Sequence, residues 1–244
     1  MGSRLVKLIV VGNSHIASVS AAGQVVRDAG LEHRVMRSSA HVVDQPDGSK
    51  AIKRETADFL HAEPGPIFSM IGGNGHNVFG LVYPQKPFDF YHPDYPDRPP
   101  LPNWIIPYEQ VWDSVMRRSE TRLKELRALV AACPGRVIHL ESPPPIASQS
   151  WLTARLAPRM EAAGLNSYQV AAPSVRFKLW RIGSAIFREE CARLGVPFLP
   201  APPEASDENG FLRRRYWRDP THANGQYGAL LIRQMMEHLD VAPV

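Results

Sequence analysis

The sequence predicts a single α/β domain, in which helices cover both faces of a five-stranded parallel sheet. Short apolar runs alternate along the chain with longer amphipathic segments, an order typical of βαβ units. The 244 residues are 44% hydrophobic, enough for one sizeable core. Neither an internal repeat nor a linker divides the chain. We therefore expect one three-layer αβα domain over residues 1–244.

Five short apolar runs are the expected strands. Right-handed crossovers between parallel strands place all their carboxyl ends on one edge of the sheet, which is where such sheets bind ligands. Residues that directly follow a strand are therefore the first candidates for a functional site. The expected strands are residues 5–11, 33–37, 66–71, 136–140 and 196–199.

Longer segments with apolar residues at helical spacing are the expected helices. Gly30 and Gly195 follow two of them, at positions where glycine commonly ends a helix. The expected helices are residues 14–29, 49–61, 108–132, 174–194 and 223–239.

The segment 79–107 shows neither the helical nor the strand periodicity of apolar residues. It is rich in proline and aromatic residues, including Tyr91 and Trp104. Connections this long in a compact domain are usually functional or disordered, and the aromatic content argues against disorder. Aromatic faces supply rigid apolar area for a ligand. We expect an active-site insert that contacts substrate through Tyr91 and Trp104, with a dimer interface as the competing use.

Composition and charge argue against several classes of protein. The net charge of +4 is spread along the chain apart from arginines at 213–218, so we expect no nucleic-acid partner. The apolar run 8–11 is too short for a membrane span and leads directly into Ser14, a candidate functional residue, which argues against a cleaved signal peptide. We expect no membrane partner and a cytoplasmic location. Cys133 and Cys191 lack the spacing of a disulfide framework or a metal site. We expect no metal and no cofactor, and the oligomeric state stays open.

Ser14 stands between the first expected strand and the following helix, in the sequence Gly12-Asn13-Ser14-His15. A serine at this sheet edge lies near helix N-terminal N–H groups, which favour developing negative charge. The position suits a nucleophile. The alternative is that Ser14 only caps the helix.

Asn74 follows the third expected strand, in Ile71-Gly72-Gly73-Asn74-Gly75. The glycines permit a sharp turn, and a carboxamide placed there can donate an N–H to an oxyanion. The alternative is a simple Asn-Gly turn.

Asp219 and His222 stand just before the last expected helix, in Asp219-Pro220-Thr221-His222. At this spacing the carboxylate can hold Nδ1–H of the imidazole and leave Nε2 to accept a serine proton. The alternative is that Asp219 or Thr221 caps the helix and His222 is a surface residue. All three motifs would converge on one edge of one sheet.

These motifs resemble those of the SGNH (GDSL-type) hydrolase family, in the same order and over nearly the whole chain. The resemblance implies a flavodoxin-like fold and a catalytic triad in which Ser14 attacks an ester carbonyl, His222 transfers the proton and Asp219 orients His222. It also implies an oxyanion hole that includes Asn74. The matching residues are Gly12-x-Ser14, Gly72-Gly73-Asn74 and Asp219-x-x-His222.

Three positions depart from the family pattern. Asn13 and Gly75 replace aspartates that are common beside the serine and the asparagine. The family's second motif supplies a glycine N–H to the oxyanion hole, yet residues 38–41 contain no glycine. We expect the oxyanion donors to be the Ser14 N–H, Asn74 and the backbone of Ser39 or its neighbour Ala40.

Residues that flank these motifs are the remaining candidates for substrate contacts, namely His15, Gly73 and His76; for both histidines a purely structural role is the alternative. The expected activity is that of a serine esterase or deacylase acting through an acyl-enzyme on an O-acyl ester, foremost O-acetyl, of a carbohydrate or small metabolite. Two alternatives stay open: an O-acyltransferase that uses the same residues, and a non-catalytic SGNH-like binding module.

Overall fold

The computed structural model describes residues 7–72, 75–83, 86–101, 104–165 and 168–239. Its centre is a five-stranded parallel sheet of order β11-β9-β5-β1-β2. This is the flavodoxin-like strand order, in which the topological switch point lies between the neighbouring strands β1 and β5. All five predicted strands are confirmed: β1 (Lys7–Gly12), β2 (Glu32–Arg37), β5 (Ile67–Met70), β9 (Val137–Leu140) and β11 (Phe198–Leu199).

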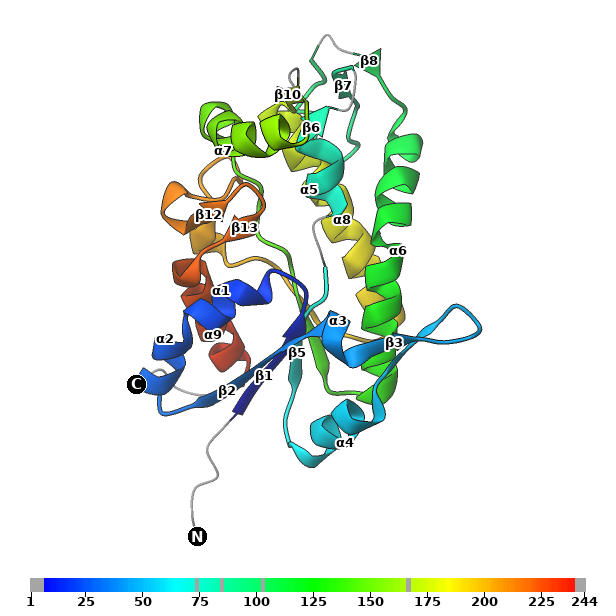
Figure 1. The fold of residues 1–244 in the computed structure, drawn as a ribbon, viewed down its shortest axis with the longest axis vertical. Coiled ribbons are helices and arrows are strands. Elements are labelled where there is room, and N and C mark those ends of the chain that lie inside the picture. Colours follow the sequence, from blue (N-terminus) through cyan, green and yellow to red (C-terminus); the bar gives the residue numbers. More distant parts are fainter. Residues whose placement is uncertain (1–6, 73–74, 84–85, 102–103, 166–167, 240–244) are drawn as a thin grey trace.

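Side chains of β1 alternate between two buried clusters, one on each face of the sheet. Leu8 and Val10 belong to one cluster and Ile9 and Val11 to the other, as the period of two in a strand requires. Figure 1 shows α1, α2 and α9 on one side of the sheet and α6 with α8 on the other. The prediction of three layers is confirmed. The covering helices are α1 (Ile16–Ala21), α2 (Gly23–Asp28), α4 (Arg54–Ala62), α6 (Tyr108–Ala132), α8 (Pro173–Arg193) and α9 (Gly225–His238).

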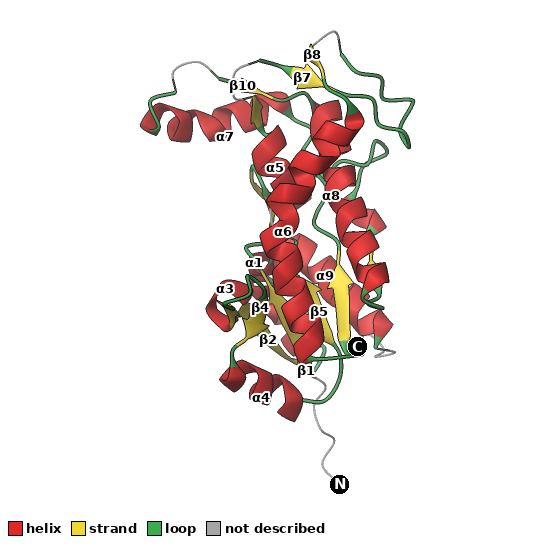
Figure 2. Cartoon of the chain, turned by 90° about the vertical axis from the view of Figure 1, so that its right-hand side faces the viewer, coloured by secondary structure: helices red, strands yellow, loops and turns green. Residues whose placement is uncertain are grey.

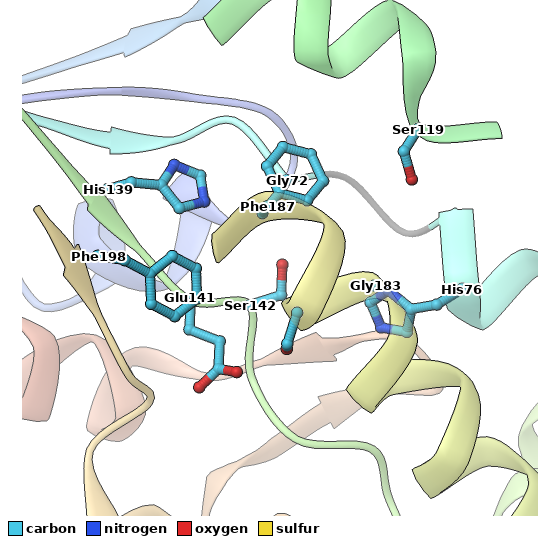
Figure 3. Close-up of a pocket in the computed structure, with 10 residues that line it drawn as sticks. Gly72, His76, Ser119, His139, Glu141, Ser142, Gly183, Phe187 and Phe198 are labelled. Carbon is cyan, nitrogen blue, oxygen red and sulfur yellow. The ribbon is translucent and has the colours of Figure 1, made fainter. Parts of the chain in front are cut away.

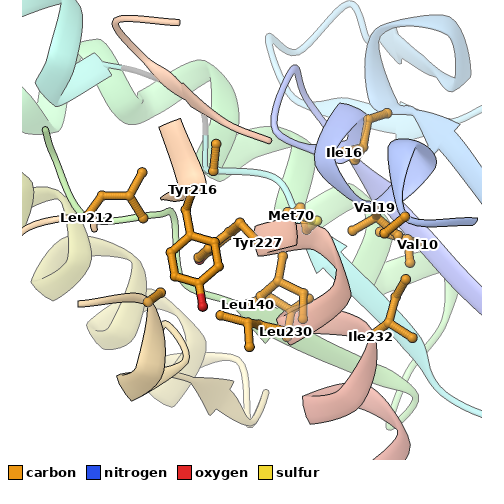
Figure 4. Close-up of a cluster of buried hydrophobic side chains, with 14 of the residues drawn as sticks. Val10, Ile16, Val19, Met70, Leu140, Leu212, Tyr216, Tyr227, Leu230 and Ile232 are labelled. Carbon is orange, nitrogen blue, oxygen red and sulfur yellow. The ribbon is translucent and has the colours of Figure 1, made fainter. Parts of the chain in front are cut away.

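Figure 4 shows the cluster beneath α1 and α9, where Tyr227 and Leu230 of α9 lie near Leu140 of β9. Tyr227 is fully buried. The apolar stripe predicted from the sequence of the last helix therefore faces the sheet.

The predicted helix 49–61 is partly wrong, because its first residues form a strand. β4 (Lys50–Ile52) pairs with β3 (Val42–Asp44) in an antiparallel hairpin. The turn between them has Gly48 at φ +78°, a conformation that glycine adopts at no steric cost. The predicted helix 14–29 is also interrupted at Ala22, which gives α1 and α2.

Several short elements were not predicted, because two to six residues are too few to show a period. They are α3 (Ser38–His41), α5 (Gly75–Gly80), β6 (Val82–Tyr83) with β10 (Gln169–Val170), β7 (Phe88–Asp89) with β8 (Trp104–Ile105), and β12 (Trp217–Asp219) with β13 (His222–Ala223). The longer α7 (Gln149–Ala162) was also missed; it is largely exposed and buries only Leu152 and Leu156. Within the described ranges, no helix is both long and apolar enough to span a bilayer.

The insert contains β7 and β8, which both views place at the end of α6 far from the sheet (Figures 1 and 2). A fully buried ion pair fixes it there: Lys178 Nζ of α8 donates to Asp89 Oδ1 at 2.6 Å, and both side chains are 0% exposed. The same carboxylate accepts from the backbone N–H groups of Phe90 and Leu101, at 2.8 and 2.9 Å. The insert is therefore anchored to α8.

Candidate active site

Gly12 ends β1 where this strand runs beside β5. A Cβ atom at Gly12 would lie 2.7 Å from Met70 Cβ and 2.7 Å from Ile16 Cγ2, closer than side chains tolerate. The next residue, Asn13, donates its backbone N–H to Met70 O at 3.3 Å. The glycine thus permits the close approach that puts the half-buried Ser14 at the switch point between β1 and β5.

Close packing of α9 on α1 brings the two ends of the sequence together. A Cβ atom at Gly228 of α9 would lie 2.0 Å from Ser18 O of α1, so only glycine allows this contact. Since α1 follows Ser14 and α9 follows His222, the contact brings both preceding turns to one edge of the sheet. The ring centroid of His222 lies 5.1 Å from that of His15, the neighbour of Ser14.

Asp219 and His222 face each other across the β12–β13 hairpin. His222 Nδ1 lies 2.8 Å from Asp219 Oδ1 and 3.0 Å from Oδ2, and the backbone N–H groups of Thr221 and His222 donate to Oδ1, each at 3.1 Å. Burial alone would raise the pKa of Asp219, but the bonds from His222 and Thr221 outweigh it and lower the pKa to about 2. The ionised carboxylate therefore holds Nδ1, and Nε2 is the nitrogen that can accept a proton.

The side chains of Ser14, Asp219 and Thr221 do not cap the helices that follow them. The N-cap of α1 is His15, which makes no side-chain capping bond. Asn224 caps α9 by accepting from the backbone of Gln226 and Tyr227. The capping alternatives for Ser14, Asp219 and Thr221 are therefore wrong.

A buried hydrogen-bond network that the sequence did not reveal holds the Ser14 turn. Asn13 Nδ2 donates to Ser38 Oγ at 2.7 Å and to Glu125 Oε2 at 3.1 Å, and Ser38 Oγ donates to the same Oε2 at 2.8 Å. Arg122 pairs with the other carboxylate oxygen, Oε1. Glu125 lies on α6 and is 3% exposed. Its one sign in the sequence is a charged residue within an apolar helical stripe.

The candidate oxyanion donors follow three adjacent strands. Ser14 follows β1, and the exposed Ser39 follows β2 in α3. Gly73 and Asn74 come after β5 and lie outside the described residues. The order β5-β1-β2 puts β1, which Ser14 follows, between the other two strands.

His15 and His76 are both buried, at 4% and 6% exposure. His76 packs against Gly183 of α8, where a Cβ atom would lie 3.2 Å from its Nδ1. Burial, and secondly the nearby His15, lowers the pKa of His76 to about 3. It lines a cavity of about 10 Å³ together with His139 and Ser142 (Figure 3), room for about one water molecule. A neutral packed ring fits the structural alternative for His76.

Tyr91 and Trp104 are 66% and 64% exposed, and the structure does not bring them to Ser14. The neighbours of Tyr91, Phe90 and His92, pack their rings against Tyr108 at the start of α6. From Tyr108 to Glu125, which contacts the Ser14 turn, the helix rises about 25 Å. The anchoring of the insert to α8 explains the separation.

Two hollows adjoin the Asp219–His222 hairpin. A narrow crevice beside His222 is lined by Pro143, Pro144 and Pro145. A larger pocket of about 340 Å³ is lined by Trp151 and Trp217, whose ring centroids lie 5.0 Å apart, together with Arg214, Ser148 and Ser150. In the part of the chain that is described, no group of three or more His, Cys, Asp or Glu side chains could hold a metal ion.

No protein-family model matches the sequence, and neither does any curated protein. Similar solved structures include a GDSL-like lipase from Bacteroides thetaiotaomicron, with 15% identity over 96% of this chain and 88% of that one and a TM-score of 0.44. A carbohydrate acetylesterase from Sinorhizobium meliloti has 10% identity over 96% and 98%, with a TM-score of 0.42. The periplasmic domain of a lipopolysaccharide acetyltransferase from Salmonella ser. Paratyphi A has 10% identity over 98% and 85%, with a TM-score of 0.49. At these TM-scores the likenesses assign neither family nor function.

Proposed function

We propose that this chain is a serine esterase that cleaves O-acyl esters through an acyl-enzyme, with Ser14 as nucleophile. The observation that carries the proposal is the ionised Asp219 holding Nδ1 of His222, whose ring lies beside the turn of Ser14. These elements come from opposite ends of the chain. A carboxylate, an imidazole and a serine at the switch point of a parallel sheet form the arrangement that activates a hydroxyl.

In the first half of the reaction, Ser14 Oγ bonds to the ester carbonyl carbon while His222 Nε2 takes the hydroxyl proton. The tetrahedral intermediate collapses, the ester C–O bond breaks, and the departing alcohol receives that proton from His222. Water then attacks the acyl-enzyme with His222 again as base, releasing the acid and restoring Ser14. Asp219 stabilises the protonated imidazole at both stages.

The oxyanion of the intermediate requires donors arranged in advance. We assign this role to the Ser14 and Ser39 backbone N–H groups and to Asn74. The hydrogen bond from Asn13 to Ser38 supports the pairing of the first two, because each of these bonded residues directly precedes one of the donors.

The alcohol part of the substrate is proposed to be a carbohydrate, and the acyl group an acetyl. The support is the pocket of Trp151 and Trp217, since indole faces with nearby hydroxyl and guanidinium groups suit a sugar ring. Trp217 stands two residues before Asp219 on β12. The crevice of about 10 Å³ at Pro143–Pro145 and His222 leaves little room for a long acyl chain.

The test is hydrolysis of p-nitrophenyl acetate and of an acetylated sugar by the wild type, Ser14→Ala and Ser20→Ala. Ser20 is an exposed serine of α1 and serves as the matched control. We expect turnover in the wild type and in Ser20→Ala, and none above background in Ser14→Ala. Turnover that survives Ser14→Ala contradicts the proposal. Product diverted to an added sugar acceptor would instead identify an acyltransferase.

A further inference from the structure

The network beneath Ser14 assigns a role to a residue outside the three motifs. We propose that Glu125 is a positioning residue, which holds the nucleophile turn and the Ser39 turn in one fixed arrangement and thereby requires asparagine at position 13. The inference rests on the proposed function. Glu125 of α6 supplies a carboxylate at the nucleophile turn, where Asn13 replaces the aspartate that is common beside the serine.

Hydrogen-bond chemistry fixes how the network is built. An ionised carboxylate only accepts, so Asn13 has to turn its NH₂ group, and Ser38 its hydroxyl proton, toward Glu125 Oε2. Arg122 pairs with Oε1 and supplies the compensating positive charge. With Glu125 almost fully buried, each bond lies in a low dielectric, where its loss is costly.

The same geometry explains why an aspartate is unsuitable at position 13. Replacing the Asn13 amide with a carboxylate would put an oxygen where Nδ2 now lies, 3.1 Å from Glu125 Oε2. Two buried carboxylates at that distance cannot both stay ionised. Ser38 has one hydroxyl proton and cannot serve both. The turn would move or one acid would have to be protonated.

The network reaches the reacting atoms through two adjacent residues. Asn13 precedes the nucleophile and Ser38 precedes Ser39, and their strands are neighbours in register, with Gly12 opposite Arg37. The hydrogen bonds between the two turns therefore set the separation between Ser14 Oγ and the Ser39 N–H. Misplacement of such groups by about 1 Å can lower a rate by about 10²-fold.

A charge-exchange cycle tests the proposal. The variants are Glu125→Gln, Asn13→Asp and the double variant, which restores one carboxylate and one amide in exchanged positions. We expect each single change to lower kcat by about 10–100-fold with a smaller change in KM. The double variant should recover at least tenfold over Asn13→Asp. The rate of fluorophosphonate labelling of Ser14 should follow kcat.

Glu190→Gln is the matched control for stability. Glu190 is another buried helical glutamate, 8% exposed and bonded to Arg127 and Arg193 of α6 and α8. We expect it to lower the unfolding temperature as much as Glu125→Gln does while leaving kcat unchanged. Should Asn13→Asp fail to fold, Glu125→Gln and the double variant still decide the question.

The outcomes separate the two proposals. Glu125→Gln with the kcat of Glu190→Gln, or a double variant no better than Asn13→Asp, overturns the positioning role while Ser14-dependent turnover leaves the proposed function intact. Absence of any Ser14-dependent turnover in the wild type overturns the proposed function and this inference with it. A loss in Glu125→Gln that the exchange rescues supports the inference.

Discussion

Two buried carboxylates, Glu125 of α6 and Asp89 of β7, hold two different regions of the molecule. Glu125 holds the turns at the carboxyl edge of the sheet, whereas Asp89 holds the insert through Lys178. Both regions contain polar and aromatic residues that the sequence marked as functional. The first gathers Ser14 and His222 from opposite ends of the chain, and the second keeps Tyr91 and Trp104 away from them.

The position of a residue in the sheet topology indicates a site, whereas aromatic composition alone does not. Asn13, which follows β1, bonds to Met70 at the end of β5 and to Ser38, which follows β2, because parallel strands share one carboxyl edge. The aromatic rings of the insert pack instead against each other and against α6 and α8, as His92 on Tyr108 and Tyr95 on Phe177 show. Substitutions in the first region should therefore lower kcat, whereas those in the insert should lower the stability of the fold.

Replacing His222 with alanine should have the largest effect, a fall in kcat of roughly 10⁴–10⁶-fold, because the base that activates Ser14 is lost. His92 of the insert is the matched histidine: it is 5% exposed, and burial lowers its pKa to about 4. His92→Ala should lower the unfolding temperature and leave kcat within a few-fold. A comparable loss of kcat in both variants would contradict the expectation that the insert takes no part in the reaction.

Asp219→Asn should lower kcat by up to about 10⁴-fold, and by less than His222→Ala, because the geometry survives while the anion that orients the ring is lost. The pKa of Asp219 is lowered to about 2. The stabilisation of the folded protein by its charge is therefore present above the ordinary carboxyl range and is lost only as pH falls through about 2. Asp219 should therefore add no ionisation of its own to kcat/KM of the wild type between pH 9 and pH 4. Two ionisations in that window would place a second titrating group in the mechanism.

Asp89→Asn should act on stability and spare the chemistry. Removing the charge leaves the Lys178 ammonium buried without its counterion, which costs about 3–5 kcal/mol. Urea unfolding monitored by tryptophan fluorescence measures the loss, and p-nitrophenyl acetate turnover below the unfolding transition should stay within a few-fold of wild type. A fall in kcat of a hundredfold in folded protein would connect the insert to the reaction.

Tyr91→Ala and Trp104→Ala should have the smallest effect. Both side chains are mostly exposed, and the neighbours of Tyr91 pack on Tyr108, which lies about 25 Å along α6 from Glu125 by the rise of the helix. We expect kcat/KM for acetyl and butyryl esters to change by less than about twofold, as surface substitutions usually do. A selective loss on one ester would restore the sequence-based prediction that the insert contacts substrate.

The sequence was sufficient for the sheet and for the pairing of Asp219 with His222 because each carries a local signal. Gly12 before Ser14 and the spacing of Asp219 and His222 are readable without knowing the fold. Glu125 was not predictable, because a helical stripe indicates burial and says nothing of which residue lies opposite. The hairpin of β3 and β4 was missed for a similar reason, since its pairing partner decides whether Lys50–Ile52 is strand or helix.

Covalent labelling identifies the nucleophile without a substrate. The wild type, Ser14→Ala and His222→Ala are incubated with a fluorophosphonate, and the modified residue is mapped by peptide mass spectrometry. We expect one adduct, on Ser14, formed rapidly in wild type, far more slowly in His222→Ala and absent from Ser14→Ala. An adduct on another serine, or labelling of Ser14 at an undiminished rate in His222→Ala, would contradict it.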